Sequence, residues 1–172
     1  GWYVTGTHGT QQHRGNRPAQ DPTRTASRGD DTNLNLTSLR RLLNPSRYLT
    51  PSSDIVALMT LEHQTHLINL FTRISWEAKI ARHNGELDTT ERNARQRGVE
   101  EIVRYMLFAD EVAIAGPIQG VSSFRRTFPV HGPHDQHGRS LRDFDLRTRL
   151  FRYPLSYMIY SPLFDDLPPP VL

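Results

Sequence analysis

Two groups of histidines contain the side chains in this sequence best able to bind a metal ion. The first group is Glu62-His63-Gln64-Thr65-His66, which lies within a long apolar stretch. On a helix, Glu62 and His66 share one face, where a carboxylate and an imidazole can hold a transition metal or a haem iron, or hydrogen-bond to each other. His63 points roughly 100° away from Glu62 and is a looser third candidate ligand.

The same group also has a structural interpretation. Asn69 and Arg73 continue the stripe that Glu62 and His66 begin, and apolar residues flank this stripe on both sides. Buried polar groups must be paired, so these four side chains could form a buried network that fixes how the helix packs. Carboxylate-bridged di-iron bundles need Glu-x-x-His on paired helices, and the next helix along the chain has no histidine. We therefore favour the buried network over a metal centre.

The second group places His131, His134 and His137 three residues apart in a loop rich in glycine and proline. Such a triad could hold zinc or copper. The loop offers no rigid scaffold of the kind that metal sites use, so a solvated connection is the simpler interpretation. Metal binding by these three residues is kept as an alternative prediction.

Composition and motifs exclude several classes of site. The 172 residues include no cysteine, which excludes disulfides, Cys-ligated zinc, iron–sulfur clusters and covalent haem attachment through C-x-x-C-H. The sequence has no nucleophile elbow, phosphate-binding glycine loop or H-E-x-x-H motif, and this favours a non-catalytic protein. No apolar run approaches the roughly 20 residues that a membrane-spanning helix needs. Residues 51–116 carry seven bases and ten acids, so the net charge of +3 forms no basic stripe and nucleic-acid binding is not expected.

The elements that position these groups are mainly helical. Asp54 is a typical helix N-cap, and the helical pattern that follows it stops near Gly85. A second helix is predicted at about 90–114. Because a short polar loop joins the two, we expect a long antiparallel hairpin. A short third helix is predicted at 140–151, which gives a mainly α fold class.

The chain divides into three parts around this hairpin. Residues 1–38 are polar with few apolar groups, so we expect an extended arm that the rest of the protein or a partner holds. Residues 39–116 form the hairpin. Residues 117–172 form a loop-rich segment with the third helix, packed on the hairpin in one domain and ending in an extended proline-rich arm. Because the first residue is glycine rather than methionine, we expect a processed product or part of a longer chain.

Aromatic and arginine side chains near both ends are candidate contacts with partner proteins, because interfaces are enriched in these residue types. The candidates are Trp2, Tyr3, Arg152, Tyr153, Tyr157, Tyr160 and Phe164. The tyrosines could equally lie at the edge of a core, or contact a membrane surface. An extended arm around a small core is typical of an assembly subunit whose surface is completed by other proteins or by copies of itself.

Several strings in the sequence are distinctive: SDIVALM at 53–59, LEHQTH at 61–66, RYMLFADE at 104–111, GRSLRDFDL at 138–146 and LFRYP at 150–154. Together they resemble a family of exported bacterial proteins linked to c-type cytochromes. The resemblance implies a periplasmic or extracellular location, and it implies that any covalent haem belongs to a partner or to a further segment.

These observations combine into one expectation about function. We expect a non-catalytic accessory subunit of a larger cytochrome-type electron-transfer assembly, with a c-type cytochrome or copies of itself as partners. The alternative is a small protein that binds a transition metal or non-covalent haem through Glu62 and His66 or through the loop triad.

Overall fold

The computed structural model describes residues 2–11, 13, 15–16, 35–85 and 89–169. Its elements in chain order are η2 (Pro45–Arg47), α1 (Ile55–Asn84), α2 (Thr89–Met106), α3 (Phe124–Val130), η3 (Tyr157–Tyr160) and α4 (Pro162–Asp165), where η denotes a 3₁₀ turn. The described residues contain no strand, only three isolated bridges, so the prediction of a mainly helical protein is confirmed. None of the described helices combines the length and hydrophobicity needed to cross a membrane.

Helix α1 begins at a capping carboxylate and ends at a glycine. The Asp54 side chain accepts hydrogen bonds from the backbone N–H groups of Val56 and Ala57. At the other end, Gly85 has a φ of 93°, a conformation that favours glycine. One stripe of the helix is buried, mostly at spacings of three and four residues: Val56, Thr60, His63, Leu67, Leu70, Phe71, Ile74, Ala78 and Ala81. This stripe decides which face of α1 turns toward the core.

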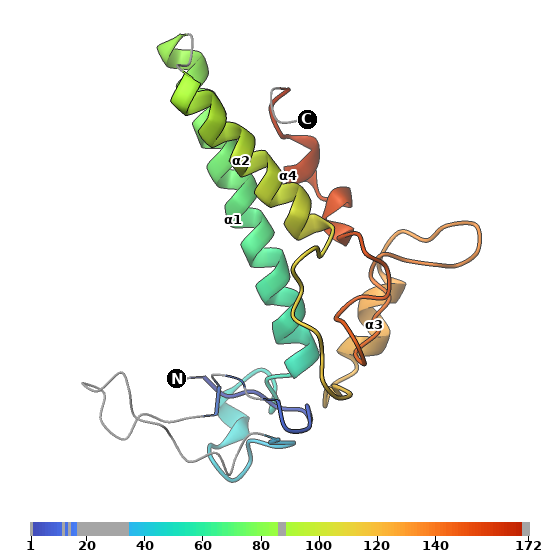
Figure 1. The fold of residues 1–172 in the computed structure, drawn as a ribbon. Coiled ribbons are helices and arrows are strands. Elements are labelled where there is room, and N and C mark those ends of the chain that lie inside the picture. Colours follow the sequence, from blue (N-terminus) through green and yellow to red (C-terminus); the bar gives the residue numbers. More distant parts are fainter. Residues whose placement is uncertain (1, 12, 14, 17–34, 86–88, 170–172) are drawn as a thin grey trace.

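Helix α2 packs along α1 (Figure 1). A Cβ on Gly98 would lie 3.0 Å from Cδ1 of Ile74, so the absence of a side chain lets the two helices approach closely here. Further along α2, the Tyr105 ring lies 4.3 Å from the His66 ring. The contacts therefore run in opposite senses along the two helices.

Helix α2 is shorter than the range of 90–114 that the pattern predicts. Phe108 adopts a left-handed φ of 54°, which stops the helix, and the Ala109 N–H bonds to the Arg104 carbonyl at 2.9 Å. The Phe108 ring turns inward to lie 4.9 Å from the His63 ring. Packing of this side chain therefore overrides the helical pattern, and residues 107–114 leave α2 as a separate segment.

The predicted helix at 140–151 is wrong. Leu146 adopts a left-handed φ of 61°, and Phe144 pairs with Phe151 in an antiparallel bridge, so the chain folds back on itself where the helix was expected. Helix α3 forms at 124–130 instead, where the sequence pattern predicts a loop.

The described part of the N-terminal arm lies against the start of α1 (Figure 1). Thr7 pairs with Gln119 in an isolated bridge, and Gly6 beside it has a φ of 145°. A Cβ on Gly6 would collide with the Ile55 side chain and the Gln119 carbonyl oxygen. Only glycine fits at this position, and its small size lets the arm pack closely against the start of α1. The arm's predicted course over residues 17–34 lies outside the described residues.

A cluster of aromatic rings fastens the third part of the chain to α1. The guanidinium of Arg142 lies over two of these rings, 4.9 Å from the Phe128 centroid and 5.4 Å from that of Tyr157. The rings in mutual contact are Phe124, Phe128, Phe144, Phe151 and Tyr157. One hydrophobic core therefore continues from the helices into the loop-rich segment.

Candidate functional site

A groove runs along the exposed side of α1. One cavity of about 700 Å³ lies between α1, α2 and residues 107–114. A second, of about 880 Å³, lies between α1, the N-terminal arm and residues 112–118. The two cavities share five lining residues, so they adjoin, and we call the combined depression the α1 groove. The shared residues are Met59, Glu62, His66, Val112 and Ile114.

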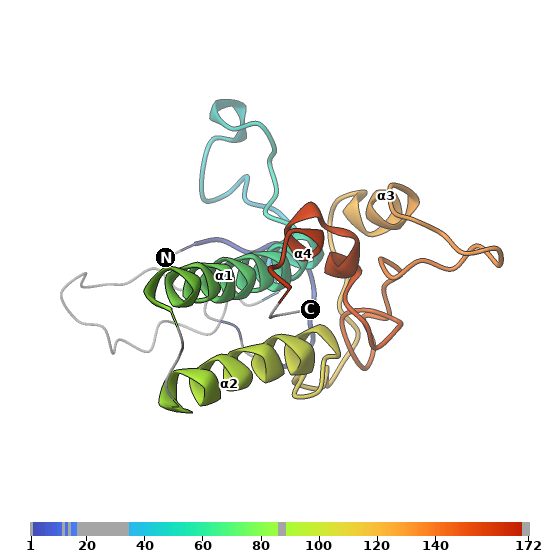
Figure 2. The same ribbon diagram turned by 90° about the horizontal axis from the view of Figure 1, so that it is seen from above.

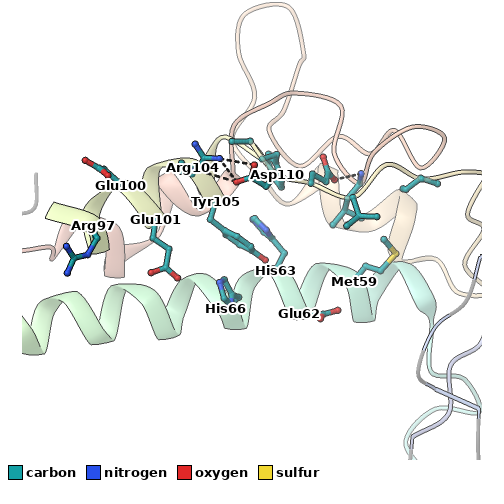
Figure 3. Close-up of a pocket in the computed structure, with 16 residues that line it drawn as sticks. Met59, Glu62, His63, His66, Arg97, Glu100, Glu101, Arg104, Tyr105 and Asp110 are labelled. Atoms are coloured by element: carbon teal, nitrogen blue, oxygen red, sulfur yellow. Dashed lines mark hydrogen bonds and ion pairs between the residues drawn. The ribbon is translucent and has the colours of Figure 1, made fainter. Parts of the chain in front are cut away.

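The predicted buried network on α1 is wrong, because all four of its side chains are exposed. They are Glu62, His66, Asn69 and Arg73. The buried stripe of the helix lies about one residue away, and it contains His63 instead of Glu62. Figure 3 shows Glu62 and His66 one turn apart along α1, while His63 points toward Tyr105 of α2. Both Glu62 and His66 line the two cavities described above. They therefore line the α1 groove.

His63 is buried at the back of the groove. Its Nε2 lies 2.7 Å from the Ser156 hydroxyl oxygen, which is itself buried. The Tyr105 and Phe108 rings stack on the imidazole, with centroids at 5.2 and 4.9 Å. Burial, with a smaller contribution from neighbouring His66, lowers the pKa of His63 to about 4. The imidazole is therefore neutral at neutral pH and serves as a packed hydrogen-bonding group.

The candidate metal ligands are not assembled into one centre. Among the described residues, no three His, Asp or Glu side chains gather closely enough to hold a metal ion. Glu62 and His66 face the groove, while His63 turns into the core. The three histidines of the loop are exposed: His131, His134 and His137.

The candidate interface residues are divided between surface and core. Trp2 is exposed and lines the α1 groove. Tyr160 and Arg152 are also exposed, whereas Tyr3 and Tyr153 are half-buried. Of the other two, Tyr157 is buried in the core, with its hydroxyl bonded to Gln64, and Phe164 is half-buried against the core, with its ring in contact with that of Phe71.

The sequence pattern does not predict the wall of the groove at 107–114, because it predicts that the second helix continues to about residue 114. Val112 is 83% exposed on this wall. Figure 3 shows the adjacent acidic residue Asp110 with its ion pair to Arg104 at the end of α2. The inward turn of Phe108 puts this wall opposite α1, and sequence spacing carries no signal for that turn.

Glu111 joins this wall to residues 149 and 150. One of its carboxylate oxygens accepts a hydrogen bond from the Leu150 N–H at 2.8 Å. The other accepts one from the Nε–H of Arg149 at 3.2 Å. Both side chains of this ion pair are largely shielded from solvent. The neighbouring pair of Asp110 and Arg104 is open to solvent. Glu111 is therefore the residue that fixes the wall.

We expect Glu111→Ala to lower the free energy of unfolding by about 2 kcal/mol, because it leaves the Leu150 N–H and the Arg149 side chain without their acceptor. Asp110→Ala is the matched control, and its effect should stay below about 1 kcal/mol because exposed ion pairs contribute little. Urea unfolding followed by circular dichroism measures both. Equal losses in the two variants would show that Glu111 has no special part in holding the wall.

Comparison of the sequence with models of protein families and with curated proteins finds no match, and comparison of the fold with solved structures finds none either.

Proposed function

We propose that this chain is a non-catalytic accessory subunit of a larger exported assembly, and that it docks a partner protein in the α1 groove. The observation that carries the proposal is the exposed apolar lining of the groove. Trp2, Leu61 and Val112 are all exposed around it, from three separate segments of the chain. Large apolar groups gathered from separate segments are typical of a surface that another protein covers.

The size of the groove supports a protein partner. Its two cavities adjoin along α1 and together are larger than a site for one small ligand. Where the two cavities adjoin, the apolar side chains of Met59, Val112 and Ile114 lie together with the polar groups of Glu62 and His66, a mixture that protein–protein interfaces share.

The charge of the groove indicates what kind of surface the partner presents. The half between α1 and α2 is lined by five carboxylates and two arginines: Glu62, Glu100, Glu101, Asp110, Glu111, Arg97 and Arg104. Because Arg73 and Arg149 also pair with two of these carboxylates, a small acidic excess remains. An excess of acidic groups favours a partner whose apolar patch has a basic rim. In the electron-transfer assembly that the sequence resemblance suggests, a c-type cytochrome with such a rim is the partner that we propose.

The test uses Val112→Asp and, as matched control, Val130→Asp. Val130 is 71% exposed on α3 and does not line the groove, so both variants add one charge at an exposed valine. We expect Val112→Asp to weaken binding of a purified soluble c-type cytochrome with a basic surface at least tenfold, because a charge in an apolar contact is costly. Val130→Asp should leave the affinity unchanged. Isothermal titration calorimetry measures both.

Light scattering and metal analysis of the purified chain test the other outcomes. A single species of 19.8 kDa without metal fits a subunit that awaits its partner. A stable homo-oligomer that Val112→Asp dissociates would make a second copy the occupant of the groove. A stoichiometric metal or haem that His66→Ala removes would contradict the proposal and favour a cofactor-binding protein.

A further inference from the structure

A second surface lies on the loop that precedes α1. Residues 35–53 project away from the helices, as Figure 2 shows for the loop that includes η2. This segment contains three arginines and no acidic residue. The arginines, Arg40, Arg41 and Arg47, are all exposed.

The projection is fastened at both ends to the N-terminal arm. The Gly6 N–H bonds to the Leu36 carbonyl at 2.7 Å, and the Thr5 N–H bonds to the Ser53 carbonyl at 2.7 Å. Leu39 is buried between these ends and anchors the loop to the fold. The rest of the protein therefore holds the loop in its projecting position, and no bound partner is needed to do so.

Several apolar side chains of this projecting loop are exposed. Leu49 is fully exposed, and Leu42 is 45% exposed. Tyr48 is also exposed, and it lines a cavity that Trp2 of the N-terminal arm lines as well. The exposed leucines and arginines of this loop distinguish it from the half of the α1 groove between α1 and α2, whose charged lining residues are mostly carboxylates.

We propose that this loop docks the protein onto a membrane surface that contains anionic lipids. Three exposed arginines on a segment that contains no acidic residue of its own attract anionic headgroups, and each contributes about fivefold to membrane partitioning. Trp and Tyr favour the headgroup region, and leucine favours the acyl boundary beneath it. A projecting loop can insert exposed leucines into a bilayer, whereas a protein partner would need a pocket to receive them.

The test measures co-sedimentation of the full chain with two kinds of vesicle. One kind is phosphatidylcholine alone, and the other is equal parts of phosphatidylcholine and phosphatidylglycerol. We expect binding to the anionic vesicles only, weakening as salt is added. The fluorescence of Trp2, read in a Trp76→Phe background, should shift to shorter wavelength on binding.

Paired variants assign the binding to this loop. Arg40→Gln/Arg41→Gln should lower partitioning about 25-fold, while Arg125→Gln/Arg126→Gln, an adjacent exposed pair on α3, should lower it far less. Leu49→Ser with Leu42→Ser should lower partitioning at least tenfold.

Leu163→Ser controls for the leucines, because Leu163 is 43% exposed on α4, remote from the loop in sequence. Circular dichroism of every variant confirms that the helices are retained. Absence of binding to anionic vesicles by the unaltered chain would overturn the proposal. So would equal losses in the loop variants and their controls, and so would binding to an acidic protein surface in place of vesicles.

Discussion

Replacing Asp54 by alanine is expected to lower the free energy of unfolding by about 3 kcal/mol, the largest loss from one side chain that we predict. One carboxylate oxygen accepts the backbone N–H groups of Val56 and Ala57 at the start of α1. The other accepts those of Val121 and Ser122, each at 2.7 Å. A single buried carboxylate therefore satisfies four backbone donors from two segments that are distant in sequence.

The surroundings of Asp54 leave little room for adjustment. A Cβ on Gly120 would collide with both carboxylate oxygens, so the chain passes directly over them. On the other side, the Ile55 N–H bonds to the Thr5 carbonyl at 2.8 Å, which ties the N-terminal arm to the same point. Loss of Asp54 should therefore also loosen the end of the α1 groove that this arm forms.

The pH dependence of stability gives Asp54 a second signature. Burial, the largest single influence, raises the pKa of this carboxyl, but the hydrogen bonds from Ser122, Ala57 and Val121 together lower it below its ordinary value of 3.8. The stabilisation is then complete above the pKa of the unfolded chain and is lost as the pH falls through the folded pKa. Asp54→Asn should remove this acid-dependent component.

Asp135→Asn is the control for Asp54→Asn. Asp135 also accepts backbone N–H groups, from His137 and Arg139, but it lies in an exposed loop. Urea unfolding by circular dichroism at neutral and acidic pH measures both variants. If Asp135→Asn costs as much stability as Asp54→Asn, then the burial of Asp54 between α1 and residues 121–122 is not what makes this side chain important.

Local signals explain why the first helix could be predicted from the sequence. Asp54 and Gly85 are a capping carboxylate and a terminating glycine, and neither depends on distant residues. The sequence did not reveal the second pair of donors on Asp54, since Val121 and Ser122 reach it only after the chain has folded. The helix cap could be predicted from the sequence, and the contact of Asp54 with residues 121–122 could not.

The predictions that failed depend on packing between distant residues. A helical pattern continues through Phe108, yet its ring packs on His63 and its backbone adopts a left-handed conformation that ends the helix. On α1 the apolar residues surround much of the helix, so composition could not decide whether His63 or His66 faces the core. Contacts with η3 and with the segment after α2 decide it, because Ser156 and Phe108 both contact His63.

The burial of His63 leads to a prediction in a different pH range. Its pKa is about 4 in the folded protein and about 6.5 in an unfolded chain. Between these values the unfolded chain binds the proton and the folded protein does not, so stability falls as the pH falls from about 6.5 to about 4. The full loss across this window is about 3 kcal/mol, and it levels off below the lower value.

The neighbours of His63 favour the neutral imidazole. The Ser156 hydroxyl accepts the Met158 N–H at 3.2 Å, which leaves its own hydrogen free to donate to Nε2 of His63. Burial raises the pKa of Tyr157 to about 12 and also raises that of Tyr105, so neither ring supplies a negative charge to a protonated His63. Protonation therefore adds a buried charge without a counter-charge.

His63→Gln separates this effect from the other acid-sensitive groups. Glutamine can still bond to Ser156 but does not titrate. The free energy of unfolding of this variant should therefore be lower than that of the unaltered protein at neutral pH, and it should change little between a pH of about 6.5 and about 4. His66→Gln, one turn along α1 and exposed, should keep most of the slope of the unaltered protein, because His66 makes only the smaller contribution to the lowered pKa of His63. Because Asp54 acts only below its ordinary value of 3.8, the two contributions fall in separate ranges of one titration. An unchanged slope in His63→Gln would mean that groups other than His63 carry the acid sensitivity, and that the imidazole at the back of the groove takes up its proton in the folded protein.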